Sequence, residues 1–314
     1  MLKPNSALWP RATYLQATVL SVVSDYISLT KPPIILLLLV TALGGMFLAA
    51  QGTPLVSTML LLMLGGGAAA GGASAINHYL DRDIDGVMVR TRRRPLPGRR
   101  ISPGGALVFG VVLNVFAFVL LATGVNFLAA SLTLSGTLFY VFVYTWWLKR
   151  STPQNIVIGG AAGSIPPVAG WAAVTGGIEI PALYLFAIIF FWTPPHFWAL
   201  ALLLKEDYAR AGIPMLPVVR GVVATRRSIL VYTAVVVAIS VLFFLTTDAV
   251  GWVYLASVLV LGGLFLASAW RLFALGPNAS AMDGMRKARH LYLYSLLYLG
   301  LVFLSMILDS VVGL

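Results

Sequence analysis

Long apolar stretches separated by short polar segments set the hydropathy pattern of this chain. A helix of about 20 apolar residues spans the hydrocarbon core of a bilayer. Nine stretches approach that length, and they cover residues 33–50, 56–79, 104–122, 126–147, 155–175, 181–203, 228–247, 251–271 and 290–312. The pattern therefore predicts an all-α polytopic membrane protein with nine transmembrane helices.

The basic residues fall on one side of these predicted spans. All 21 lysines and arginines lie in the N-terminal arm or around the segments that follow the second, fourth, sixth and eighth spans. The turns after the other spans hold none. Because basic loops are retained in the cytoplasm, we expect the N-terminus inside, the C-terminus outside, and insertion in the cytoplasmic (cell inner) membrane.

The first 32 residues differ in character from the rest. We expect residues 1–32 to form a cytoplasmic arm with an amphipathic helix over 12–30 at the bilayer surface, and residues 33–314 to form the transmembrane domain. Asp25 and Lys31 interrupt the apolar residues of this region. The arm therefore does not resemble a signal peptide.

Composition narrows the chemistry. Hydrophobic residues make up 60% of the chain, and there is no cysteine, which excludes disulfides, thiolate nucleophiles and cysteine-ligated metal sites. The net charge of +11 is spread over short loops at one membrane edge. That distribution favours contact with anionic lipids and anionic substrates, and it argues against nucleic acid as a partner.

Charged residues are concentrated directly after the second predicted span. If this segment stays helical, Asn77, Asp81 and Asp85 recur every four residues and share one face, whereas Asp83 points elsewhere. An amide and two carboxylates can hold a hard cation such as Mg²⁺, which often takes substrate phosphates as its other ligands. This face is the first candidate for a catalytic site.

Arginines follow the acidic residues closely. Arg90 and Arg94 are suited to phosphate oxygens, which match the guanidinium fork. The alternative is that all of these charges only flank a transmembrane helix and fix its orientation. Orientation depends on basic residues and does not require the acids.

Two later loops also carry candidate residues. The loop after the sixth span places Asp207 three residues before Arg210, a spacing that allows an ion pair. The loop after the fourth span contains Lys149, preceded by Trp146 and Trp147, which suit an interfacial aromatic belt.

The sixth span contains a double proline, Pro194-Pro195, followed by His196. Two prolines are expected to break or bend the helix, and the bend should face protein or a cavity and not lipid. An ionisable side chain inside a span is a functional candidate by default.

These residues resemble a known family. The pattern Asn77-x3-Asp81-x-Asp83-x-Asp85, with Arg90-Thr91-x-x-Arg94-Pro95, is similar to the aspartate-rich motif of the intramembrane prenyltransferase superfamily typified by UbiA. The strings at 29–32 (Leu-Thr-Lys-Pro), 192–198 and 207–217 resemble its protoheme farnesyltransferase branch, the heme O synthases. The resemblance runs from about residue 25 to the end of the chain.

The resemblance implies nine helices around a central cavity and a Mg²⁺-dependent enzyme. It implies transfer of a farnesyl group from farnesyl diphosphate to a vinyl group of heme b, with addition of water, which gives heme O and diphosphate. The active site would face the cytoplasmic side. A partnership with heme A synthase or terminal oxidase assembly is a family expectation.

The roles expected on this basis form one hypothesis. Mg²⁺ would be held by Asn77, Asp81 and Asp85, with Asp207 supporting a second ion or orienting a base. Departing charge would be neutralised by Arg90, Arg94 and Lys149. His78 or His196 would coordinate the heme iron, because neutral imidazole is a common iron ligand.

Two other functions remain open from the residues alone. A prenyltransferase that acts on an aromatic or quinone precursor would need the same diphosphate site. A polytopic transporter would also have broken helices and buried charges. The transporter is less favoured because the acidic residues lie at one membrane edge and not at mid-depth.

Overall fold

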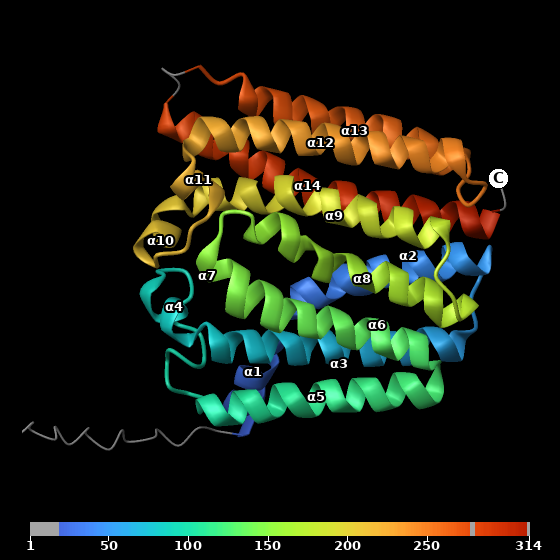
Figure 1. The fold of residues 1–314 in the computed structure, drawn as a ribbon, viewed down its shortest axis with the longest axis horizontal. Coiled ribbons are helices and arrows are strands. Elements are labelled where there is room, and N and C mark those ends of the chain that lie inside the picture. The colour runs from blue at the N-terminus through green and yellow to red at the C-terminus, as the bar shows by residue number, and fades with distance from the viewer. Residues whose placement is uncertain (1–18, 277–279, 313–314) are drawn as a thin grey trace, which may run out of the picture.

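The computed structural model describes residues 19–276 and 280–312, and the regular secondary structure of these residues is entirely helical (Figure 1). Nine helices among them are long and apolar enough to cross a membrane. They are α2 (Pro32–Ala50), α3 (Val56–Leu80), α5 (Pro103–Gly124), α6 (Phe127–Leu138) continued by η1 (Phe139–Leu148) and α7 (Lys149–Ser151), α8 (Asn155–Thr175), α9 (Ile180–Leu203), α12 (Gly221–Thr246), α13 (Trp252–Phe273) and α14 (Ala281–Val312). The prediction of an all-α fold with nine helices long enough to span a membrane is confirmed, and the orientation of the termini stays a prediction.

Two of the predicted spans begin too late. The seventh was expected from residue 228, but α12 begins at Gly221, and the ninth was expected from residue 290, but α14 begins at Ala281. Both helices carry arginine in these added turns, and charge ends an apolar stretch without ending a helix. Hydropathy therefore marked the end of the apolar stretch and not the end of the helix.

Four shorter helices complete the described fold. They are α1 (Val19–Thr30), α4 (Arg82–Val87), α10 (Lys205–Arg210) and α11 (Leu216–Val219). Figure 1 shows α4, α7, α10 and α11 at the same end of the bundle. Loops far apart in sequence, after α3, α7 and α9, are thereby brought to one edge.

The expected arm is described only in part. Residues 12–18 of the predicted amphipathic helix lie outside the described residues, and α1 accounts for the remainder. Its Val19, Leu20 and Val23 are exposed, and its Asp25 pairs with Arg100 at 2.9 Å. The exposed apolar residues are compatible with a surface helix, and its place at the bilayer surface stays a prediction.

The double proline does not break its helix, so that part of the expectation is wrong. The helix α9 runs without interruption through Pro194 and Pro195, and both are buried. Because Pro194 has no N–H, the Phe190 carbonyl loses its usual partner. That carbonyl faces Gly160 of α8, whose missing side chain leaves room beside it. The prolines face protein, as expected.

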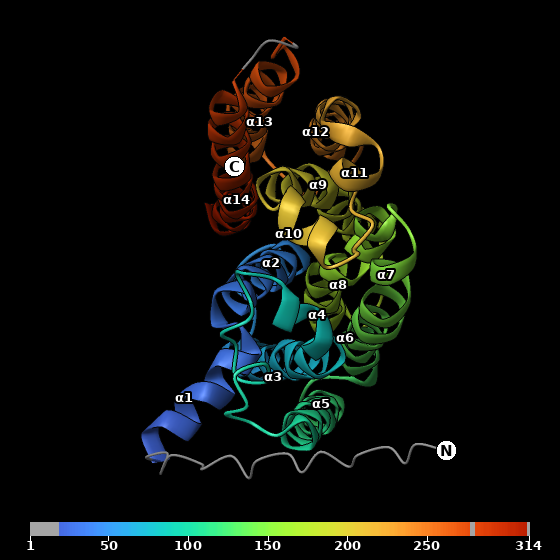
Figure 2. The ribbon, with the colours of Figure 1, turned by 90° about the vertical axis from the view of Figure 1, so that its left-hand side faces the viewer.

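Glycines allow the closest helix contacts in the bundle. A methyl group on Gly170 of α8 would lie 2.1 Å from the carbonyl oxygen of Ala42 in α2. A methyl group on Gly45 of α2 would lie 2.1 Å from the carbonyl oxygen of Pro167 in α8. The two backbones therefore touch directly, a contact that only small residues permit. Figure 2 shows α2 and α8 side by side near the middle of the bundle.

Candidate active site

The acidic face begins on the last turn of α3 and continues into α4. The Asp81 N–H donates to the Asn77 carbonyl at 2.9 Å, and the Asp85 N–H donates to the Asp81 carbonyl at 2.8 Å. Helical hydrogen bonding therefore persists across the junction of α3 and α4. The side chains of Asn77 and Asp81 meet as the spacing predicted, with 2.7 Å between Nδ2 and Oδ2.

Asp81 is the most enclosed acid of the group, with 1% of its surface exposed. Its Oδ2 accepts from the Lys149 ammonium at 2.5 Å. Its Oδ1 lies 3.8 Å from Arg150 and has no hydrogen-bond partner among the residues that the structure describes. The sequence hypothesis placed Lys149 at this site, and the structure brings it there from 68 residues away.

Asp85 is held by the arginine-rich loop. The Arg94 Nη1 donates to both carboxylate oxygens of Asp85 at 2.9 Å. The Thr91 hydroxyl donates to the Asp85 carbonyl at 3.0 Å. These bonds fold the loop back onto α4, so that Arg94 joins the cluster although it lies nine residues further along the chain.

Lys31 is a member of the cluster that sequence reasoning did not assign. Its Nζ donates to Oδ1 of Asn77 at 2.9 Å. It stands immediately before α2 in a left-handed conformation, with φ of 55°. Burial, together with the positive charges of Arg94 and Lys149, lowers the pKa of Lys31 to about 7. The available signal was the Leu-Thr-Lys-Pro string at 29–32, which was used only for the family resemblance.

The π-helix η1 sets which side chains of the fourth span face this cluster. A helix with i→i+5 bonds turns by roughly 80° per residue, against about 100° in an α-helix. Tyr140 and Lys149 would therefore lie on opposite sides of an α-helix, but they share one side here. Tyr140 stacks on Tyr144 at 5.6 Å, and Thr145 accepts from Nδ2 of Asn77 at 3.1 Å. Hydropathy gave no signal for this change of helix type.

Asp83 points away from the group, as expected. Its side chain is 62% exposed and pairs with Arg150 at 2.8 Å. The hydrogen bond from Arg150 lowers the pKa of Asp83 to about 2. This pair anchors the end of α7 to α4 at the solvent side of the site.

Asp207 and Arg90 lie outside the network of direct bonds. Asp207 is buried on α10 and pairs with Arg210, as its spacing allowed. Arg90 is exposed and forms no ion pair with any described residue. Tyr208, also on α10, lies within electrostatic reach of Arg90 and Asp81. Burial raises the pKa of Tyr208, which keeps its hydroxyl protonated as a donor.

The candidate histidines occupy different environments. Both ring nitrogens of His78 are buried without a hydrogen-bond partner in the described chain, and Nδ1 lies 3.7 Å from Asp85. The His196 ring stacks between Trp192 and Tyr292, and its Nδ1 is 2.7 Å from the Ser295 hydroxyl. His78 therefore belongs to the cluster, whereas His196 packs between α9 and α14.

The donor set could hold a divalent cation only together with further ligands. Within residues 19–276 and 280–312 no three Asp, Glu or His side chains lie close enough to bind one metal on their own. The buried, unpartnered Oδ1 of Asp81 is nevertheless an oxygen ligand of the kind that Mg²⁺ takes, and Asn77 and Asp85 add oxygens on the same stretch. The residues fit a magnesium ion that completes its shell with substrate oxygens.

Charge also favours an anion at this place. Lys31, Arg94, Lys149 and Arg150 face three acids, so cations exceed carboxylates by one when Lys31 is protonated. Most of these groups are partly or fully buried, where charges interact more strongly than in water. The arrangement suits a phosphate-bearing substrate that adds negative charge together with a divalent ion.

Comparison with known proteins gives the same family as the motifs. The model of the UbiA prenyltransferase family matches residues 38–296. The protoheme IX farnesyltransferase of Symbiobacterium thermophilum is 51% identical over 288 residues, which are 92% of this chain and 94% of that protein. The protein of the same name from Roseiflexus sp. (strain RS-1) is 52% identical over 93% of this chain but 53% of its own length. The chain thus spans about half the length of some relatives and nearly all of others.

Solved structures share the fold at low sequence identity. A structure of digeranylgeranylglyceryl phosphate synthase has a TM-score of 0.74 at 18% identity, and it covers 92% of this chain and 99% of that one. A UbiA homolog from Archaeoglobus fulgidus bound to DMAPP and Mg²⁺ has a TM-score of 0.59 at 17% identity, with 88% and 99% covered.

Proposed function

The chain belongs to the UbiA prenyltransferase family, and on that premise we propose that it transfers a farnesyl group from farnesyl diphosphate to a vinyl group of heme b. Water adds in the same reaction, and the products are heme O and diphosphate. The observation that carries this proposal is the match to proteins named protoheme IX farnesyltransferase, about half identical over nearly the whole length of one of them. The buried ion-pair cluster around Asp81 supplies the site.

The cluster is proposed to bind the diphosphate. Without substrate, Lys149 and Arg94 neutralise Asp81 and Asp85. Asn77, Asp81 and Asp85 would hold Mg²⁺, which supplies positive charge to the diphosphate oxygens; a structural neighbour bound to Mg²⁺ and DMAPP supports this choice of metal. The ammonium and guanidinium groups that then lose their carboxylate partners are free to donate to the same phosphates.

Departure of the leaving group is the step that these residues favour. The bond between C1 of the farnesyl chain and the bridging oxygen breaks, and its electron pair leaves with the diphosphate. Lys31, Lys149 and Arg94 are held in place by bonds to Asn77, Asp81 and Asp85, so little reorganisation would oppose the charge that develops. Removing one such preorganised donor typically lowers a rate by about 100-fold to 1,000-fold.

The allylic cation is then attacked by the vinyl group. A new bond joins C1 to the outer vinyl carbon, and the positive charge moves to the carbon next to the porphyrin ring. A water oxygen bonds to that carbon and loses one proton, which leaves the hydroxyl group of the product. Asp207 on α10 and the Tyr208 hydroxyl are proposed to orient groups on this side of the site, and Arg90 to meet the diphosphate from the loop.

His78 is the better placed candidate for the heme iron. Both of its ring nitrogens lack partners in the described chain, and it lies on the turn of α3 that also carries Asn77. His196 uses Nδ1 in a bond to Ser295 and is stacked on two aromatic rings. A role for His196 would therefore be limited to its other nitrogen.

The location follows from the charge distribution. We place the protein in the cytoplasmic membrane with its N-terminus and its active site on the cytoplasmic side, because the basic loops gather at the end of the bundle that holds Asp81. A product as apolar as heme O stays in the bilayer. Heme A synthase or terminal oxidase assembly is the proposed recipient.

The direct test is a reaction with purified protein in detergent, heme b, farnesyl diphosphate and Mg²⁺, with pigments followed by mass spectrometry. A product that carries farnesyl plus water, and that requires Mg²⁺, is the expected result. An unchanged heme b, with prenylation of an added aromatic or quinone precursor, would refute the choice of acceptor and leave the prenyl transfer standing.

A further inference from the structure

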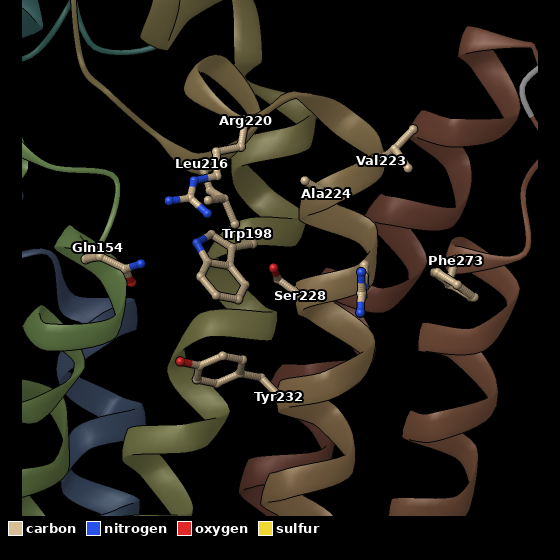
Figure 3. A pocket seen from close by; sticks show the side chains of 10 residues that line it. Gln154, Trp198, Leu216, Arg220, Val223, Ala224, Ser228, Tyr232 and Phe273 are labelled. Atoms are coloured by element: carbon tan, nitrogen blue, oxygen red, sulfur yellow. The ribbon is translucent and has the colours of Figure 1, made fainter.

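A cavity with both apolar and basic lining residues lies between α9, α11 and α12, away from the Asp81 cluster (Figure 3). It has a volume of about 630 Å³, roughly twenty times the 30 Å³ or so that one water takes up in the liquid. Its polar lining consists of Gln154, Trp198, Arg220, Arg227, Ser228 and Tyr232. None of these residues belongs to the site described above.

The cavity is lined by donors that lack acceptors. The indole nitrogen of Trp198 is buried without a hydrogen-bond partner, and only 3% of the residue is exposed. The side chains of Gln154, Ser228 and Tyr232 likewise form no hydrogen bond with any described residue. An unpaired buried donor costs about 1–3 kcal/mol, so an acceptor that reaches the Trp198 N–H is favoured, and the exposed Gln154, Arg220 and Arg227 side chains can donate to the same ligand.

The charges of the lining side chains indicate that the ligand is an anion. Arg220 and Arg227 form no ion pair within the described chain, and the lining contains no acid. This differs from the Asp81 cluster, where most of the cations are matched by carboxylates. Figure 3 shows Arg220, Gln154 and the nitrogen edge of Trp198 around the same space, with Tyr232 below them. Two unpaired guanidinium groups and a ring of donors fit an oxyanion.

The position of the cavity identifies the source of the oxyanion. It lies at the end of the bundle where the basic loops gather, and it is open toward exposed apolar residues, Val223 at 76% and Phe273 at 37% exposure. Basic pockets between transmembrane helices on the cytoplasmic side suit anionic lipid head groups. A lone phosphate would fill only a small part of this volume.

We propose that this cavity binds the head group of an anionic membrane phospholipid. The phosphate lies between Arg220 and Arg227 and accepts from the Trp198 indole N–H, while the acyl chains leave over Val223 and Phe273. A choline head group fits poorly, because its own positive charge would face the arginine pair. Binding at this place ties α9, α11 and α12 together at the membrane edge.

The test uses the full-length protein in a mild detergent, and native mass spectrometry to titrate phosphatidylglycerol against phosphatidylcholine. We expect tighter binding of one phosphatidylglycerol, and a loss of about tenfold or more when Arg220→Gln and Arg227→Gln are combined. Arg271→Gln with Arg289→Gln removes the same charge from two exposed residues outside the cavity and should leave the affinity unchanged. Equal losses in both double variants would overturn the proposal.

A conservative variant covers the case in which the double substitution prevents folding. Trp198→Phe keeps an aromatic ring and removes only the N–H donor, so it should weaken phosphatidylglycerol severalfold without unfolding α9. Displacement of the lipid by an equal concentration of inorganic phosphate would mean that the cavity binds a free anion. Displacement one for one by heme b would assign it to the porphyrin. Either result would refute a lipid site and leave farnesyl transfer untouched.

Discussion

The Nζ atom of Lys31 lies 2.9 Å from Oδ1 of Asn77, 46 residues further along the chain. This bond joins the start of α2 to the end of α3, directly beside Asp81. It adds a second ammonium group to that of Lys149, which binds Asp81, so that two lysines contact the acidic face. The left-handed backbone of Lys31, with φ of 55°, is a conformation that a non-glycine residue adopts rarely. Its persistence here suggests that the position of this side chain matters.

Replacing Lys31 by Met should weaken binding of farnesyl diphosphate by about tenfold or more, because a hydrogen bond from a charged group is lost from a buried site. Isothermal titration with a non-reactive diphosphate analogue measures this effect. Lys205→Met removes the same charge from α10 outside the cluster and serves as the control. Equal affinities in the wild type and Lys31→Met would remove Lys31 from the site.

Asp81→Asn should fold normally and lose turnover by about 100-fold or more. The amide keeps the shape of the carboxylate, but it removes the negative charge that faces Lys149 and that a magnesium ion requires. Asp83→Asn is the matched control, since Asp83 lies two residues away, is 62% exposed and pairs only with Arg150. An exposed ion pair contributes about 0–1 kcal/mol, so that variant should stay active. Full activity of Asp81→Asn would contradict the metal role.

The lowered pKa of Lys31 predicts how the metal-free protein responds to pH. The pKa is about 7 in the folded chain against 10.5 for an unperturbed lysine. The unfolded state therefore binds more protons between these values, and stability should rise with pH across that window. Thermal unfolding in EDTA, followed by tryptophan fluorescence from about pH 7 to pH 9, should show this rise. The slope should be smaller in Lys31→Met, and identical slopes would mean that Lys31 titrates normally.

The sequence carried enough information for the spans and for contacts within one helix. Nine apolar stretches of sufficient length identified nine helices, and the four-residue spacing of Asn77 and Asp81 predicted their contact. Both follow from helix geometry alone. The exposed position of Asp83 follows from the same geometry.

The contacts between distant segments were beyond the reach of sequence patterns. The bonds from Asn77 to Lys31 and to Thr145 depend on how α2 and the fourth span pack against α3. The side that Thr145 and Lys149 present depends on η1, and no hydropathy pattern distinguishes a π-helix from an α-helix. The Phe190 carbonyl that Pro194 leaves without a partner lies against Gly160 of the neighbouring α8, another contact between segments distant in sequence.

The contacts of Asp309 predict a stability effect at the end of the bundle opposite the candidate site. This buried carboxylate of α14 accepts from the backbone N–H groups of Gly251, Val253 and Tyr254 at 2.9, 3.2 and 2.8 Å. It thereby caps the first turn of α13. Loss of such a cap costs about 1–2 kcal/mol, so Asp309→Ala should lower the unfolding temperature. Asp248→Ala, an exposed acid in the same connection, should not, and equal shifts would assign the effect to charge alone.

The last prediction concerns Gly170, where the absence of a side chain allows the backbones of α2 and α8 to approach closely. Because a methyl group there would lie 2.1 Å from the Ala42 carbonyl oxygen, Gly170→Ala must push the two backbones apart. Overpacking of this kind typically costs about 1–3 kcal/mol. Gly163→Ala is the matched control in the same helix, since nothing lies within 4 Å of the added methyl group. That change should be neutral or stabilising by up to about 1 kcal/mol through helix propensity. Opposite shifts in unfolding temperature are therefore expected, and a neutral Gly170→Ala would show that the contact yields easily.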